Sequence, residues 1–307
     1  DPAATAIASV QGGPPVEVVI AGAAGMRAQK VHNLLAAIGT LRPQEDVVVF
    51  ADADIVPKPD WIARLVVPLQ SHDVYAVSGY RWMTPSNDAW SSAAVCAANA
   101  SVATLPRLPR WNQTWGGSTA LRRDTLDMLS LTLFWKDLVL DDIPLTIALR
   151  GIGGQVTAPQ SLLVPSPIAW NWPTLIAFGR RQYLFVRWFT PKLWALSAAG
   201  TTIPLLGWAV AVPLAIGGNG YAIGAMIVAN VLDQLRASLR SRVPRILWNE
   251  EMPRSMALLD RFGTPFVLAL HAAVVWSTLF GYSITWGGRT YRVDRNGKVI
   301  RIDVHAS

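Results

Sequence analysis

The sequence predicts an α/β domain, in which helices cover a mixed or parallel sheet, followed by helices that lie in or cross a membrane. Two observations predict this order: strand-like and helix-like segments alternate up to about residue 165, and long uncharged runs follow. The composition agrees, because 51% of the 307 residues are hydrophobic and only 15% are charged. That balance is unusually apolar for a soluble enzyme.

The strands and helices of the first half are predicted from composition and spacing. Strands are expected where β-branched and aromatic residues run together between turn residues, and helices where apolar residues recur every three or four positions. The last of these helices is rich in alanine and serine and is expected to lie over the sheet. The predicted strands are 16–22, 47–51 and 75–82, and the predicted helices are 29–38, 61–69 and 88–105.

The second half is typical of membrane-associated helices. Residues 166–192 mix Trp, Phe and Arg, as a helix in the membrane interface does. Residues 193–217 carry no charge over about 25 positions, which is enough to cross a bilayer. Residues 221–232 and 264–286 are further apolar segments. Buried helices of a soluble protein are the alternative, which the length of the runs disfavours.

A basic loop lies between these apolar segments and should face the cytoplasm, because loops rich in Lys and Arg remain on that side. Three spans after a cytoplasmic domain would put the basic C-terminal tail outside, against the same rule. Either one apolar segment is re-entrant, or the tail breaks the rule. The arginines of the predicted loop are Arg236, Arg240, Arg242, Arg245 and Arg254, and the basic residues of the tail are Arg289, Arg292, Arg295, Lys298 and Arg301.

Four regions are therefore expected. They are a cytoplasmic catalytic domain at 1–165, an interfacial helix region at 166–192, transmembrane helices with a basic loop at 193–287 and a tail at 288–307. The chain opens at Asp1 with neither Met nor a signal-like segment, so we expect it to begin inside a domain.

Charge and cysteine content limit the classes of partner and site. The net charge of +7 suits an anionic membrane surface and phosphate-bearing substrates better than nucleic acid. The single cysteine, Cys96, excludes an internal disulfide and a cysteine-based zinc site.

The most informative motif is Asp52-Ala53-Asp54, directly after the predicted strand 47–51. Open α/β sheets bind ligands just beyond the carboxyl ends of their strands. Hard cations such as Mg²⁺ or Mn²⁺ take one or two carboxylates together with substrate phosphates. We interpret the motif as a metal-bridged diphosphate site, as in enzymes that use nucleotide sugars. Two solvated turn aspartates are the alternative interpretation.

Two further motifs suit a phosphate ligand. Lys30 and Asn33 are three positions apart on the predicted helix 29–38, and a lysine there can pair with phosphate. The stretch 115–123 contains a glycine pair that ends in Gly117, and backbone approaches a ligand closely at such glycines. A solvated helix face and an ordinary turn are the respective alternatives.

Asp141 and Asp142 stand at the head of an apolar helical segment. Carboxylates are stabilised at a helix N-terminus, so a capping role explains them simply. The functional hypothesis is a general base, because sugar transfer to a hydroxyl needs a carboxylate near the acceptor to take its proton. A metal and a diphosphate would then carry the charge of the leaving group.

Together the motifs resemble the membrane-bound family 2 glycosyltransferases and, among them, the ceramide glucosyltransferase branch. The resemblance spans essentially the whole chain. It is carried by K-x-x-N at 30–33, VFADADIVPKPDWIARLVVPL around the D-x-D, WGGSTALRRDTL from Trp115, the D-D pair at 141–142, an Arg/Gln-rich stretch ending in R-W at 187–188, and WGGRTYRV in the tail.

This resemblance implies a GT-A fold and an inverting transferase. It implies that Asp52 and Asp54 hold the metal and the UDP diphosphate, and that Asp142 deprotonates the acceptor hydroxyl. Asp1 would close the first acidic motif, which helps to hold the uridine. Donor-binding residues expected beside these are Lys30, Asn33, Gly117 and Gln182.

The Q/R-x-x-R-W motif of the family corresponds to Gln182, Arg187 and Trp188 on the interfacial helix. Four residues separate Gln182 from Arg187, where the motif has two, and Leu184 stands at the usual first position. Arg187 would neutralise the departing UDP, and Trp188 would floor the acceptor pocket. Arg181 is a further candidate of this stretch.

We therefore expect an integral membrane enzyme that transfers a hexose from a UDP-sugar to a lipid hydroxyl. The expected hexose is glucose. Ceramide or a similar sphingoid or hopanoid lipid is the expected acceptor, and Mg²⁺ or Mn²⁺ the cofactor. The expected location is a bacterial inner membrane, with the catalytic domain cytoplasmic. No nucleic acid partner is expected, and the sequence indicates no particular oligomeric state. The alternatives are a processive cellulose, chitin or hyaluronan synthase, which needs more spans, and a non-catalytic membrane protein with a nucleotide-binding domain.

Overall fold

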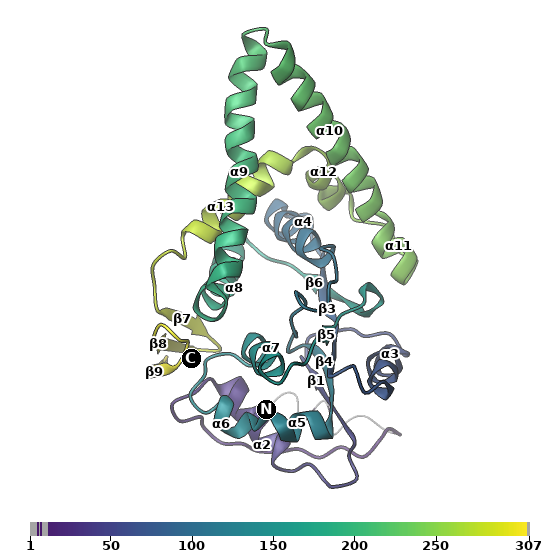
Figure 1. The fold of residues 1–307 in the computed structure, drawn as a ribbon, viewed down its shortest axis with the longest axis vertical. Helices are drawn as coiled ribbons and strands as arrows, with labels where there is room; N and C mark the ends of the chain where they lie inside the picture. The colour runs from purple at the N-terminus through teal and green to yellow at the C-terminus, as the bar shows by residue number, and fades with distance from the viewer. Residues whose placement is uncertain (1–4, 6, 8–11, 306–307) are drawn as a thin grey trace.

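The structure, a computed structural model, describes residues 5, 7 and 12–305. A sheet-containing part lies at one end of the molecule, and two long helices extend away from it at the other (Figure 1). The expected fold class, a mixed α/β domain followed by apolar helices, is confirmed.

The main sheet is mixed and has four strands in the order β1-β4-β2-β5. They are β1 (Val47–Ala51), β4 (Ser118–Arg122), β2 (Ala76–Ser78) and β5 (Val156–Thr157). β4 runs antiparallel to both of its neighbours, and β2 runs parallel to β5. β1 therefore lies at an edge of this sheet, and its carboxyl end leads directly into the predicted diphosphate motif.

The single strand predicted at 75–82 is divided at Gly79 into two strands of different sheets. β2 stays in the main sheet, whereas β3 (Tyr80–Pro85) pairs in parallel with β6 (Leu163–Ile168). A Cβ atom at Gly79 would lie 2.5 Å from the carbonyl oxygen of Leu162, so only glycine fits where the chain changes sheets. β6 also extends past the domain boundary expected at 165.

The helices predicted in the first half are confirmed. α2 (Gln29–Ile38) has the predicted bounds, and α3 (Trp61–Val66) continues into a short 3₁₀ turn, η1 (Val67–Gln70). α4 (Trp90–Ala103) packs on β3, between the sheets and the long helices (Figure 1). The remaining helices of this half are α5 (Arg123–Leu129), α6 (Leu131–Phe134), α7 (Asp142–Gly151) and η2 (Gln160–Leu162).

The strand predicted at 16–22 is wrong, because these residues form no regular element. None of the strands in the described part of the chain pairs with them. Val16, Val18 and Ile20 are 62%, 53% and 90% exposed, so the apolar side chains that suggested a strand are not packed. Composition gives a segment the preference for extended backbone, but a strand also needs a hydrogen-bonding neighbour.

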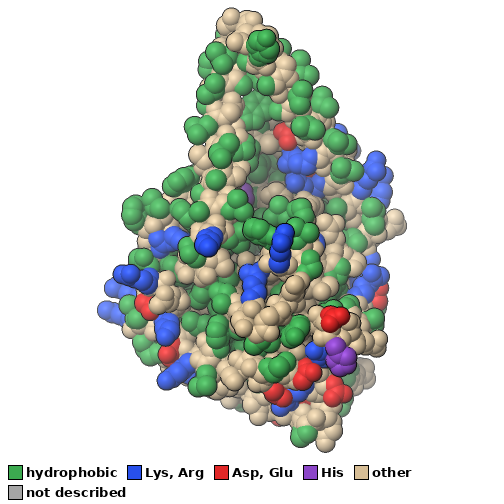
Figure 2. Space-filling view, in the orientation of Figure 1, with side chains coloured by type: hydrophobic (Ala, Val, Ile, Leu, Met, Phe, Trp, Pro, Cys, Tyr) green, Lys and Arg blue, Asp and Glu red, His purple; other side chains and the backbone are tan. Residues whose placement is uncertain are grey.

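A series of helices follows β6. It begins with α8 (Trp172–Phe189), α9 (Pro191–Ile216) and α10 (Gly220–Arg240), which continues into α11 (Arg242–Trp248). Two segments are long and apolar enough to cross a membrane, Pro191–Ile216 and Gly220–Trp248. Hydrophobic side chains cover this hairpin, whereas charged side chains gather lower on the molecule (Figure 2). The apolar segment predicted at 221–232 is therefore part of a longer helix.

The third predicted span, 264–286, is wrong in its extent. The helix α13 (Thr264–Trp276) is too short to span by itself, and it meets α12 (Arg254–Phe262) at a bend of 89°. Counting this bent pair as one span would raise the number of candidate spans to three. A strand, β7 (Ser283–Trp286), occupies the rest of the predicted segment.

The basic loop predicted between the spans is mostly helical. Its arginines lie on α10 and α11 and at the start of α12. Arg240 donates to Asp260 of α12 at 2.5 Å, and both side chains are almost completely buried. This ion pair fixes α12 against α10.

The C-terminal tail, for which no strands were predicted, forms an antiparallel sheet of β7, β8 (Arg289–Val293) and β9 (Val299–Val304). It packs against the first half of the chain. The backbone N–H of Gln29 donates to the Tyr291 hydroxyl at 3.3 Å, and the N–H of Val299 donates to the carbonyl of Asp137 at 2.7 Å. A hydrophobic core that includes Tyr291, Leu145 and Trp188 joins this sheet to α7 and α8.

Candidate active site

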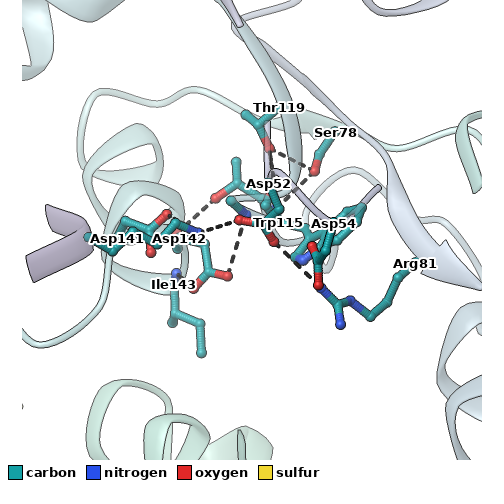
Figure 3. Close-up of polar contacts among 12 residues, drawn as sticks. Asp52, Asp54, Ser78, Arg81, Trp115, Thr119, Asp141, Asp142 and Ile143 are labelled. Atoms are coloured by element: carbon teal, nitrogen blue, oxygen red, sulfur yellow. Dashed lines mark hydrogen bonds and ion pairs between the residues drawn. The ribbon is translucent and has the colours of Figure 1, made fainter. Parts of the chain in front are cut away.

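Asp52 and Asp54 lie directly beyond β1, and their side chains lie near Asp141 and Asp142 at the start of α7 (Figure 3). We refer to the region between these two acidic pairs as the cleft. The backbone N–H of Asp52 donates to the carbonyl of Gly117 at 3.4 Å, which keeps the end of β1 beside the glycine pair. The side chain of Asp52 is 22% exposed, whereas that of Asp54 is 70% exposed. One carboxylate is thus held in the protein, and the other is open to a ligand.

Lys30 of α2 joins the two acidic motifs. Its Nζ atom lies 2.8 Å from Oδ1 of Asp52 and 3.3 Å from Oδ2 of Asp141, which is almost completely buried. Burial alone lowers the pKa of Lys30, but the negative charges of Asp141 and Asp52 outweigh it and hold that pKa above its usual value. The lysine therefore remains charged and ties α2, β1 and α7 together.

The Gly116–Gly117 pair lets the backbone pass between these charged groups. A Cβ atom on Gly116 would lie 2.2 Å from Oδ2 of Asp141 and 2.8 Å from Nζ of Lys30. A Cβ atom on Gly117 would lie 2.6 Å from Oδ2 of Asp52. No other residue fits at either position without displacing a carboxylate.

Asp142 is the first residue of α7, and its carboxylate faces the same cleft. Oδ2 accepts from the backbone N–H of Gly116 at 3.5 Å, and Oδ1 accepts from that of Ile143 at 2.7 Å. Burial and the negative charge of Asp141 raise the pKa of Asp142 to about 7, against the opposing effect of Lys30. A carboxylate with this pKa can accept a proton near neutral pH.

Arg81 of β3 completes the cleft, and the motifs did not reveal it. Its Nη2 atom lies 3.5 Å from Oδ2 of Asp52 and 3.9 Å from Oδ1 of Asp54 (Figure 3). Its guanidinium carbon lies 5.1 Å from the ring centroid of Trp115. The one signal in the sequence is a charged residue inside the otherwise apolar segment 75–82.

The residues fit a divalent cation that also binds a phosphate-bearing substrate. The described residues contain no group of three or more His, Cys, Asp or Glu side chains that could hold a metal unaided. Asp52 and Asp54 nevertheless both approach one positive group, because Arg81 lies 3.5 Å and 3.9 Å from them. Two carboxylates plus substrate phosphates are a usual ligand set for Mg²⁺.

Two other predicted donor-site residues make no hydrogen bond or ion pair with this cluster among the described residues, and a third lies outside them. Asn33 is exposed and accepts a hydrogen bond from Gln29 Nε2 at 2.8 Å, one turn away on α2. Gln182 is half-buried on α8. Asp1 lies outside the described residues. Their binding roles stay predictions.

Arg187 and Trp188 face the segment that follows α13. Arg187 donates to the carbonyl oxygens of Leu279 and Gly281, and its guanidinium lies 5.0 Å from the ring centroid of Tyr282. Trp188 is buried and donates from Nε1 to the carbonyl of Gly281 at 3.3 Å. In residues 12–305 their polar contacts go to this segment, so their catalytic roles stay predictions.

Arg181, on the same helix, packs against aromatic rings. Its guanidinium lies 5.5 Å from the ring of Phe178 and 5.6 Å from that of Trp286. Burial lowers the pKa of Arg181, and the positive charge of Arg81 lowers it further. A binding role for Arg181 stays a prediction.

Comparison with known protein families gives one match that covers almost the whole chain. A family model described as glycosyl transferase family 21 matches residues 1–299. A comparison with curated proteins found no match.

Proposed function

The chain belongs to glycosyl transferase family 21, and we propose that it is a membrane-bound inverting enzyme that transfers a hexose from a UDP-sugar to a lipid hydroxyl. Glucose is the proposed sugar, and ceramide or a similar lipid is the proposed acceptor. The observation that supports this proposal is that Asp142, whose pKa is raised to about 7, directly follows Asp141, which shares the ammonium group of Lys30 with Asp52.

In the proposed reaction Asp142 is the general base. The acceptor hydroxyl oxygen attacks the anomeric carbon of the sugar as the bond from that carbon to the diphosphate oxygen breaks. The hydroxyl proton passes to the carboxylate of Asp142, UDP leaves with the bonding electron pair, and the configuration is inverted. The raised pKa makes the carboxylate a stronger base than an exposed aspartate and leaves it substantially ionised at neutral pH.

Asp52 and Asp54 form the proposed leaving-group side of the cleft. They would hold Mg²⁺ or Mn²⁺, which would offset the negative charge that develops on the diphosphate. Lys30 fixes Asp52 in place, and the absence of side chains at Gly116 and Gly117 leaves the backbone close to both acidic motifs. The charged side chains of the site are therefore held in place before the substrate binds. Such preorganisation is a major source of catalysis.

The proposed acceptor arrives from the membrane side. α8 packs against α7, whose first residue is Asp142, and the apolar helix α9 follows α8 after a single residue. We retain Arg187 and Trp188 as residues of the acceptor side on this basis. The arginines along α10 to α12 favour a cytoplasmic location for the sheet domain, and a bacterial inner membrane is the proposed setting.

The deciding experiment incubates membranes that contain the full-length protein with radiolabelled UDP-glucose and separates the lipid extract from insoluble polymer. Label in a lipid that depends on added ceramide supports the proposal. Label in the polymer would overturn it in favour of a processive polysaccharide synthase. Membranes with the Asp142→Asn variant are the matched control.

A further inference from the structure

Arg81 carries an almost buried charge and has no role in the reaction proposed above. It lies on β3, two residues after the glycine that separates β2 from β3, and its side chain is only 14% exposed. The guanidinium nevertheless reaches the same cleft as Asp52 and Asp54 (Figure 3).

Trp115 holds this guanidinium in place. Arg81 Cζ lies 5.1 Å from the Trp115 ring centroid, and the ring of Tyr80 meets Trp115 edge-on at 6.0 Å. The backbone N–H of Trp115 donates to Ser78 Oγ at 2.9 Å, so the platform under Arg81 is itself fixed. Stacking on an aromatic ring restricts an arginine side chain but uses none of its N–H donors.

The polar contacts of Arg81 leave its donors available. The ion-pair distances of 3.5 Å and 3.9 Å to Asp52 and Asp54 are long for charge-assisted hydrogen bonds. No side-chain hydrogen bond of Arg81 to another described residue accompanies them. An arginine this deeply placed is costly without acceptors, and its planar donors match the paired oxygens of a phosphate group.

We propose that Arg81 binds the diphosphate of the sugar donor. This inference rests on the proposed use of a nucleoside diphosphate sugar. The guanidinium would meet phosphate oxygens from the protein side while Asp52 and Asp54 act through a divalent cation.

A purely structural role is the competing explanation, in which Arg81 only neutralises the two aspartates. The two roles differ in which part of the ligand they affect. A diphosphate ligand should be sensitive to Arg81, whereas uridine, which has no phosphate, should not be. A structural role would affect both ligands equally or neither.

The test measures binding of UDP by calorimetry and of uridine by ligand-observed NMR, with detergent-purified full-length protein in saturating MnCl₂. For Arg81→Ala we expect UDP affinity to fall by about 10- to 100-fold, as for lost hydrogen bonds to a charged group, with uridine binding unchanged. For Arg81→Lys we expect a smaller loss of UDP affinity, because a lysine keeps the charge but not the planar pair of donors.

The matched control is Arg107→Ala. Arg107 also lies over an aromatic ring, 5.7 Å from that of Tyr80, but its hydrogen bond goes to the carbonyl of Ala103 and not to the aspartates. We expect this variant to bind UDP as the parent does.

Each result has one meaning. UDP affinity unchanged in Arg81→Ala, or equal losses for UDP and uridine in Arg81→Lys, would overturn the proposal for Arg81 and leave the donor assignment intact. A parent protein that binds uridine but gains nothing from the diphosphate would instead overturn the donor assignment itself.

Discussion

The ammonium group of Lys30 lies 2.8 Å from the carboxylate of Asp52. The same group lies 3.3 Å from Asp141, the neighbour of the proposed base. One cation therefore connects the two carboxylate pairs that the proposed reaction assigns to different tasks. Changes on one side of the cleft should for this reason be felt on the other.

Replacing Lys30 with Met should lower the stability of the fold and raise the pKa of Asp142. The buried carboxylate of Asp141 would lose its ion-pair partner, which should destabilise the fold by about 2–4 kcal/mol. Because the charge of Lys30 opposes the rise in the pKa of Asp142, the pH profile of transfer should also move to higher pH. Thermal unfolding in detergent and rate–pH profiles would measure these effects. The exposed Lys136→Met is the control and should change neither property.

The variant Asp142→Asn should lose transferase activity but still bind UDP. Asparagine can still accept the hydrogen bond from Gly116 but cannot take a proton, so the rate should fall by about 10²- to 10⁴-fold. Transfer from labelled UDP-glucose and UDP binding by calorimetry would be compared, with the exposed Asp127→Asn as control. Turnover equal to that of the parent would show that Asp142 is not the base.

The rate of transfer should depend on pH in the direction set by a base. Since the pKa of Asp142 is raised to about 7, the carboxylate is mostly protonated below that value and mostly ionised above it. We expect the rate to reach a plateau above about pH 8 and to fall by about tenfold per unit well below pH 7. Initial rates measured from pH 5.5 to 8.5 would show this. A rate independent of pH across that range would contradict the assignment.

A methyl group at Gly116 should disrupt the cleft. In Gly116→Ala the new carbon would lie 2.2 Å from Oδ2 of Asp141, so either the carboxylate or the backbone must move. We expect transfer to fall by at least about tenfold, because small displacements of positioned groups are costly for catalysis. Gly151→Ala is the matched control, since nothing lies within 4 Å of a Cβ atom there. Equal activities of the two variants would argue against this geometry.

Removal of divalent cations should stop the reaction. With only two carboxylates in the proposed metal position, binding depends on the substrate phosphates and should be readily reversible. EDTA should abolish transfer, and added MgCl₂ or MnCl₂ should restore it. Retention of the parent rate in EDTA, after dialysis, would show that the aspartates act without a metal.

The sequence was most informative where local pattern determines structure. Helical spacing located α2 at its observed bounds, and the apolar run before Asp52 located β1. The charged pair at 141–142 was correctly placed at the head of a helix, since α7 begins at Asp142.

Features that depend on distant partners could not be predicted in the same way. The run at 16–22 has the composition of a strand, but no described strand pairs with it. Arg81 could not be linked to Asp52, because the division of the chain between two sheets at Gly79 sets the direction of its side chain. The tail sheet depends on contacts with Gln29 and Asp137, which are far away in the sequence.

The packing of the tail sheet against the first half of the chain also limits how many times the intervening helices could cross a membrane. Tyr291 can accept from Gln29 only if these two residues are on the same side of a membrane, so any crossings between them must be even in number. Two crossings by α9 and α10 would meet that condition, and the bent pair α12–α13 would then have to return to the face from which it enters. With that arrangement the arginines of the tail and those near α11 would lie on the same side of a membrane, as the positive-inside rule requires.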